Sequence, residues 1–78
     1  MREWIEALGG AANLRDVGTA AGRLRIEVAD PSKVDPAREA PGMRAVAWVA
    51  PGIAHVIVDA RRLDPARAQA ALAAALTR

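Results

Sequence analysis

The sequence predicts an α+β fold: a four-stranded antiparallel sheet with about three helices on one face. Two observations predict it. Short apolar segments rich in β-branched residues are separated by Pro-Gly turns, and helical segments with glycine or proline at their ends lie between them. The expected order is α-β-β-α-β-β-α, which suits a sheet with one covered face and one face in water. A chain of 78 residues forms a single domain, residues 1–78, near the lower size limit for one apolar core.

The first segment predicts a short amphipathic helix. Trp4, Ile5 and Leu8 recur at helical spacing, and the pair 9–10, Gly-Gly, supplies the residues that most readily end a helix. The mixed segment 13–19 follows, and we interpret it as a weak first strand.

The clearest strand is 23–28, because its residues alternate strictly between apolar and charged. One face then carries Leu24, Ile26 and Val28, and the other carries Arg23, Arg25 and Glu27. The segment 30–32, Asp-Pro-Ser, ends this strand. Asp35 followed by Pro36 then predicts a short helix to about residue 40, ended by Pro-Gly at 41–42.

The second half predicts an antiparallel hairpin and a last helix. Segments 43–50 and 53–58 are apolar and flank the turn at 51–52. Asp64 before Pro65 is a capping signal, and it opens an alanine-rich helix that runs to the C-terminus. The inward stripe of this helix is expected to be Ala68, Leu72, Ala75 and Leu76.

The aromatic residues and the only histidine are interpreted as structural. Trp4 and Trp48 each lie in an apolar pattern without another aromatic residue nearby, so we expect both in the core. His55 has no residues spaced to share a metal ion or a phosphoryl group, and we expect a packed or surface strand histidine. Arg61 and Arg62 are expected to lie in a loop with their side chains in solvent. No metal site and no cofactor are predicted.

Composition excludes several functions. The absence of cysteine excludes disulfides, thiolate metal sites and thiol nucleophiles. Eleven basic residues against nine acidic ones give a net charge of +2, too weak a field to predict nucleic-acid binding. No apolar run is long enough to span a bilayer, and Met1 to Glu6 does not form a secretory signal, so we expect a cytoplasmic location without membrane insertion.

Residues 13–30, NLRDVGTAAGRLRIEVAD, carry the most specific pattern. They resemble the phosphocysteine motif of the glucose-class (glucose/N-acetylglucosamine) IIB domains of the bacterial phosphoenolpyruvate-dependent sugar phosphotransferase system. That motif runs Asn, an apolar residue, five variable positions, Cys, any residue, Thr, Arg. Here Ala20 stands at the cysteine and Gly22 at the threonine, whereas Arg23 and the closing Asp30 match. Residues 6–14 and 30–35 are also similar to the family's sequence.

The resemblance implies a site at the turn between the first two strands. In such domains the cysteine accepts a phosphoryl group from a phosphohistidine of a IIA partner and passes it to a sugar held by the membrane IIC component. Arginines and backbone N–H groups stabilise the thiolate and hold the phosphate. Carried over to this sequence, the phosphate or anion site consists of Thr19, Ala21, Gly22, Arg23 and Arg25, with Gly18 in the same small-residue loop.

Ala20 cannot attack phosphorus, because a methyl group has no lone pair. We therefore expect no catalytic residue and a non-phosphorylatable binding or regulatory module with a degenerate active site, which recognises a IIA-type phosphocarrier or a IIC component through residues 18–25. Two alternatives remain open. One is a phosphotransfer IIB domain whose cysteine was mutated to Ala20, and the other is a small anion- or ligand-binding module that reuses the fold. The chain is an enzyme only under the phosphotransfer alternative, with the cysteine restored.

Overall fold

The computed structural model describes residues 2–20, 22–35 and 40–76 and confirms the α+β fold. Its four strands form one sheet in the order β1-β2-β4-β3, and every neighbouring pair is antiparallel. The elements, in chain order, are α1 (Arg2–Ala7), the 3-10 helix η1 (Ala11–Asn13), β1 (Leu14–Ala20), β2 (Arg23–Val28), the 3-10 helix η2 (Pro31–Lys33), β3 (Met43–Ala50), β4 (Ile53–Val58) and α2 (Pro65–Leu76).

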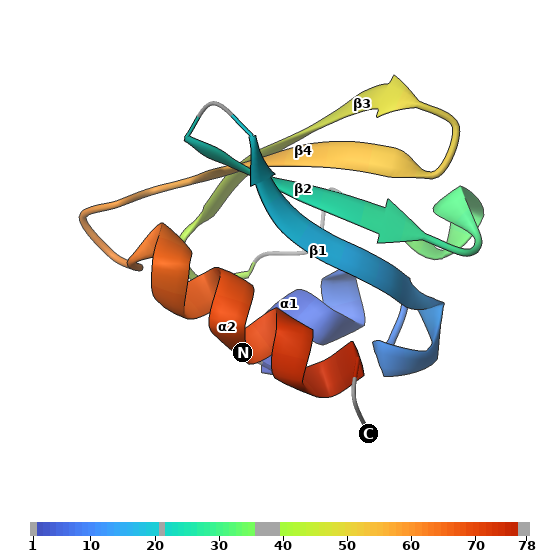
Figure 1. Cartoon of the computed structure of the whole chain (residues 1–78), viewed down its shortest axis with the longest axis horizontal. Helices are drawn as coiled ribbons and strands as arrows, with labels where there is room; N and C mark the ends of the chain where they lie inside the picture. The colour runs from blue at the N-terminus through green and yellow to red at the C-terminus, as the bar shows by residue number, and fades with distance from the viewer. Residues whose placement is uncertain (1, 21, 36–39, 77–78) are drawn as a thin grey trace.

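The two α-helices lie on the same face of the sheet (Figure 1). Helix α2 packs against β1 and β2, and the core fills the space between this face and the helices. Its largest fully buried side chains are Trp4, Leu8, Leu24, Ile26, Val56 and Leu72. The predicted inward stripe of α2 is confirmed, because Ala68 and Leu72 are fully buried while Ala75 and Leu76 pack against the core. The other face of the sheet carries the charged side of β2.

The strand boundaries agree closely with those predicted. The strands β2, β3 and β4 coincide with the predicted segments, and β1 begins and ends one residue later than predicted. Helix α2 begins at Pro65, and the Asp64 carboxylate accepts a hydrogen bond from the Ala66 N–H at 3.0 Å, as its capping position predicts. The described residues contain two α-helices where about three were expected. The segment predicted as the middle helix lies mostly outside them, at residues 36–39.

The expectation that Trp48 lies in the core is wrong, whereas that for Trp4 is confirmed. Trp48 is 42% exposed and Trp4 is 1% exposed. The reason is topological: β3 is an edge strand, and the described helix α2 packs on β1 and β2 at the opposite side of the sheet. Val49, next to Trp48, lies at an irregularity in the β3–β4 register and is 56% exposed. An apolar strand pattern cannot distinguish a central strand from an uncovered edge.

Two polar side chains attach α1 to the rest of the fold. The Trp4 indole N–H donates to the Pro41 carbonyl at 2.6 Å. Asn13 is 4% exposed, and its Nδ2 donates to the Leu8 carbonyl at 2.7 Å and to the Asp30 carbonyl at 3.1 Å. Its Oδ1 accepts from the Asp30 N–H at 2.8 Å. The first residue of the 13–30 motif therefore connects the end of α1 to the end of β2.

Candidate anion-binding site

The predicted site lies at the turn that joins β1 to β2. The antiparallel register places Ala20 directly opposite Arg23 and Gly18 directly opposite Arg25. Directly opposed residues point to the same face of a sheet, with Cβ atoms about 5 Å apart. Val17 and its partner Ile26 are buried on the helix side, so alternation places Ala20, Gly18 and both arginines on the opposite, outer face. The structure thus brings the two arginines and Ala20 together on one face.

Neither arginine is paired with another group in the part of the chain that the structure describes. Within the described ranges, Arg23 and Arg25 form no ion pair and no side-chain hydrogen bond. Arg23 is exposed, and Arg25 is half-buried. Because they are two residues apart on one strand, their Cα atoms are separated by roughly 7 Å. Two guanidinium groups on one face of a sheet, without an ion pair to any described residue, have the chemistry to bind an anion such as a phosphoryl group.

Two acidic residues limit the positive surface at its other end. Asp16 and Glu27 are directly opposed, two residues further from the turn than Gly18 and Arg25, and both lie on the outer face. The outer face therefore changes from positive to negative over two residues of each strand. An anion is attracted to the end beside the turn and repelled by the far end.

The remaining predicted residues are placed differently. Thr19 is opposite Leu24, so alternation puts its side chain on the helix side, away from both arginines. Gly22 lies in the turn with φ +79°, a conformation that a threonine adopts only with strain. Ala21 lies outside the described residues. Of the predicted site residues, the described side chains that share the outer face are thus those of Arg23 and Arg25.

A histidine that sequence reasoning set aside also lies on this face. The β2–β4 register places His55 directly opposite Arg25, and the β3–β4 register places it opposite Ala47. Gly18, Arg25, His55 and Ala47 therefore form one straight row across all four strands. No sequence signal predicts this neighbourhood, because the pairing of β2 with β4 joins segments about thirty residues apart.

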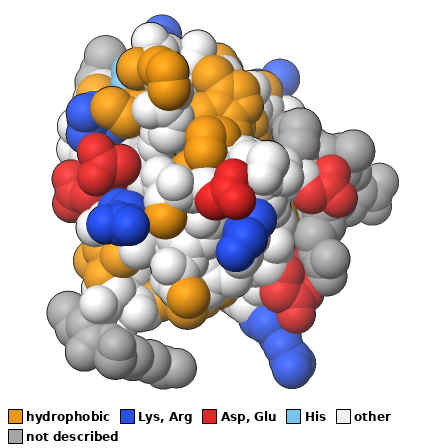
Figure 2. All heavy atoms as spheres, turned by 90° about the vertical axis from the view of Figure 1, so that its right-hand side faces the viewer, with side chains coloured by type: hydrophobic (Ala, Val, Ile, Leu, Met, Phe, Trp, Pro, Cys, Tyr) orange, Lys and Arg blue, Asp and Glu red, His pale blue; other side chains and the backbone are white. Residues whose placement is uncertain are grey.

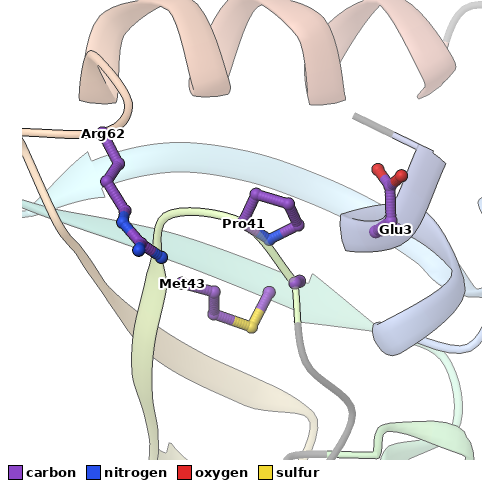
Figure 3. Close-up of a pocket in the computed structure, with 5 residues that line it drawn as sticks. Glu3, Pro41, Met43 and Arg62 are labelled. Atoms are coloured by element: carbon purple, nitrogen blue, oxygen red, sulfur yellow. The ribbon is translucent and has the colours of Figure 1, made fainter.

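Two surface hollows lie elsewhere. An apolar one of about 500 Å³ lies between the β3–β4 hairpin and η2, and Figure 2 shows hydrophobic side chains gathered over that hairpin. It is lined by Pro31, Ser32, Trp48, Val49, Ala50, Pro51 and Gly52. A second hollow, of about 480 Å³, is lined by Glu3 and Arg62 with apolar residues between them (Figure 3). The Arg62 guanidinium points toward Met43, and the Glu3 carboxylate points away from it.

Neither hollow contains a recognisable catalytic arrangement. Over residues 2–20, 22–35 and 40–76, no three His, Asp or Glu side chains are grouped so that they could hold a metal ion. No helix in these ranges is both long and apolar enough to cross a bilayer. The uncommitted arginines beside Ala20 are therefore the chemically most informative group that the described chain presents.

The fold defines the chain as a small α+β domain with two arginines beside the turn between its first two strands. Comparison with known proteins shows one similarity. The family model described as phosphotransferase system, EIIB, matches residues 2–35, which run from α1 through η2. The match confirms the predicted resemblance to a glucose-class EIIB domain, and it includes the whole candidate turn. It leaves out β3, β4 and α2. No curated protein matches the chain.

Proposed function

We propose that this EIIB-like domain is a non-phosphorylatable binding module, which recognises the phosphoryl group of a IIA-type phosphocarrier protein through the outer face beside the β1–β2 turn. One observation carries the proposal: Arg23 and Arg25 lie on the same open face as Ala20, and neither is ion-paired with a described residue. EIIB domains work with IIA and IIC components, so a cytoplasmic phosphocarrier is the partner whose chemistry fits this face.

Ala20 explains why binding would not proceed to transfer. Phosphoryl transfer from a phosphohistidine requires a nucleophile that forms a new bond to phosphorus while the P–N bond breaks and the imidazole keeps the electron pair. A methyl group cannot form that bond. The arginines would hold the phosphoryl group without accepting it.

The test uses the whole chain and a phosphorylated IIA-type protein. We expect a complex with the phosphorylated form, much weaker binding of the unphosphorylated form, and an unchanged intact mass of the domain. The double variant R23A/R25A should lose the preference for the phosphorylated form. Its control, R61A/R62A, removes two exposed arginines of the loop that follows β4, outside the predicted site, and should keep that preference. A stable phosphoryl group on the unaltered domain would contradict the proposal.

Replacing Ala20 by cysteine separates this proposal from the alternative of a competent domain that lost only its nucleophile. We expect A20C to remain without stable phosphorylation, because Gly22 supplies no hydroxyl for the phosphate and its positive φ disfavours the family's threonine. The matched control is A12C, which places a thiol at an exposed site of η1. Phosphorylation of A20C but not A12C would favour the alternative.

The remaining alternative, a module for small anions, differs from the proposal in the number of residues whose amide resonances change on binding. Phosphate or a sugar phosphate should perturb only the amide resonances near residues 18–25. A protein partner should perturb a wider part of the outer face. Saturable binding of a sugar phosphate with no response to the phosphocarrier would favour the small-ligand module.

A further inference from the structure

We propose that His55 is a third anion-binding group of this face, and that the bound phosphoryl group lies over the outer surface of Gly18 and Arg25, between the β1–β2 turn and His55. This inference rests on the proposed function, because it names how the phosphoryl group is held. It adds a residue from outside the segment that matches the family.

The sheet register places His55 within reach of the same ligand as Arg25. His55 and Arg25 are directly opposed on β4 and β2, and Gly18 is opposed to Arg25 on the other side. Each neighbour is one strand spacing from Arg25, about 5 Å. A phosphoryl group above Arg25 is therefore flanked by the open surface of Gly18 on one side and by the imidazole of His55 on the other.

The hydrogen bonding of the imidazole indicates which nitrogen faces the ligand. Nδ1 of His55 is buried and has no hydrogen-bond partner. A buried N–H without an acceptor is less tolerable than an unpaired acceptor lone pair. Of the two neutral tautomers, the structure therefore favours the one with its proton on Nε2. That nitrogen is not enclosed in the same way, and it presents an N–H donor to an anion at the surface.

The small residues of the row supply the space that the ligand needs. A Cβ built on Gly18 meets no atom within 4 Å, so the surface above this glycine is open. Ala47 ends the row on β3, Ala20 lies beside the row on β1, and each has a side chain of one carbon. An anion can thus approach the sheet surface closely enough to contact groups that lie on two strands.

The charged groups around His55 favour an anion on one side only. On the adjacent strand β2, Arg25 lies directly opposite His55, and Arg23 lies two residues closer to the β1–β2 turn. Glu27, with its partner Asp16 on β1, lies on the other side of Arg25, away from that turn. On β4 itself the flanking outer-face residues are Ile53 and Ile57, and on β3 they are alanines. The ligand is therefore expected to lie toward Arg23 and away from Glu27.

Inorganic phosphate is the probe for the first experiment, followed by amide and imidazole resonances of the isotope-labelled chain. We expect shifts at Gly18, Arg25 and His55 that saturate together. His55→Leu should weaken phosphate binding roughly tenfold, and His55→Gln, which retains an N–H donor near the Nε2 position, should recover part of the loss. Long-range proton–nitrogen spectra should show the unligated imidazole protonated on Nε2.

A second variant tests the position of the ligand without depending on His55. Gly18→Val adds a β-branched side chain where a Cβ has open space and φ is not positive, so the strand should become no less stable. The valine should nevertheless block the space above the row and weaken phosphate binding at least tenfold. A folded Gly18→Val variant with unchanged affinity would place the ligand elsewhere.

The outcomes distinguish this inference from the proposed function. If His55→Leu and Gly18→Val both keep the phosphate affinity of the unaltered chain while R23A/R25A loses it, the inference is overturned and the arginine site stands. Protonation of the imidazole on Nδ1 would also overturn it. If the phosphocarrier fails to bind but phosphate still depends on His55, the proposed partner is wrong and the anion site remains.

Discussion

The side chain of Asn13 forms two hydrogen bonds with the backbone of Asp30, 17 residues further along the chain, and a third with the carbonyl of Leu8. The first and last residues of the phosphocysteine-like motif are therefore in direct contact and have a structural role. They connect the end of α1, the start of β1 and the end of β2, and β1 ends at Ala20. The hydrogen bonds of Asn13 with Asp30 do not involve the residues of the β1–β2 turn.

Replacing Asn13 should destabilise the domain strongly. Asn13→Ala removes all three hydrogen bonds and leaves the Leu8 carbonyl and the Asp30 N–H without this partner. Unsatisfied buried groups cost about 1–3 kcal/mol each, so we expect a loss of about 3 kcal/mol in the free energy of unfolding. Denaturant unfolding measures it. The neighbouring exposed residue provides a control, because Arg15→Ala should change stability by less than about 0.5 kcal/mol. Equal effects of the two substitutions would contradict this role of Asn13.

The two glycines after α1 should differ in their tolerance of alanine. Both have positive φ, at +97° for Gly9 and +98° for Gly10. A Cβ on Gly9 would lie 2.6 Å from Nδ2 of Asn13 and 2.8 Å from Cβ of Lys33, whereas a Cβ on Gly10 meets nothing within 4 Å. Gly10→Ala should thus show the backbone strain alone, about 1–2 kcal/mol, and Gly9→Ala should cost about 1–3 kcal/mol more. Thermal unfolding of the pair checks the difference, and a Gly9→Ala variant as stable as Gly10→Ala would be inconsistent with this packing.

A threonine at position 22, which the family motif carries, should destabilise the turn. Gly22 has φ +79° and open space around its Cα, so the cost of Gly22→Thr comes from the backbone and not from a steric contact. We expect a loss of about 1–2 kcal/mol in the free energy of unfolding. Gly18→Thr is the matched control, because Gly18 also has open space but no positive φ. If Gly22→Thr were as stable as that control, the turn would have to adopt another conformation.

The two tryptophans should report opposite environments. Trp4 is buried and donates to the Pro41 carbonyl, whereas Trp48 is 42% exposed on the edge strand. In the variant Trp4→Phe, the remaining Trp48 fluorescence should be red-shifted and strongly quenched by acrylamide. In Trp48→Phe, the Trp4 emission should be blue-shifted and protected. Similar quenching of both folded variants would show that β3 is covered in solution.

The carboxyl group of Asp30 should titrate below its ordinary pKa, and Ser32 should be the main cause. The carboxylate accepts hydrogen bonds from the Ser32 hydroxyl and the Ser32 N–H, and these, with the nearby Lys33 charge, lower the pKa from 3.8. Because the folded-state pKa is lowered, the stabilisation is present above the unfolded-state pKa and is lost as the pH falls through the folded-state value. Ser32→Ala should raise the pKa of Asp30 and weaken this acid dependence. Carbon-detected NMR titration measures the pKa, and an unchanged value in Ser32→Ala would refute the assignment.

The sequence by itself determined the local structure and the family resemblance. Strict alternation over 23–28, the Pro-Gly turn at 51–52 and the Asp64-Pro65 cap each depend on neighbouring residues, so the strands, the hairpin and α2 were predicted within about a residue. The motif alone also indicated the two arginines and predicted that Ala20 stands at the position of the family's cysteine. These features are encoded by backbone preferences and periodicity, which act over a few residues.

Only the tertiary structure decided which of these elements became neighbours. Pairing of β2 with β4 put His55 beside Arg25. The edge position of β3 exposed Trp48, although the apolar sequence of this strand predicts burial. The strand register also separated Thr19 from the arginines by placing them on opposite faces. Burial and proximity depend on strand order and on which strands the helices cover. These are properties of the whole packed chain, and no local pattern of apolar and polar residues specifies them.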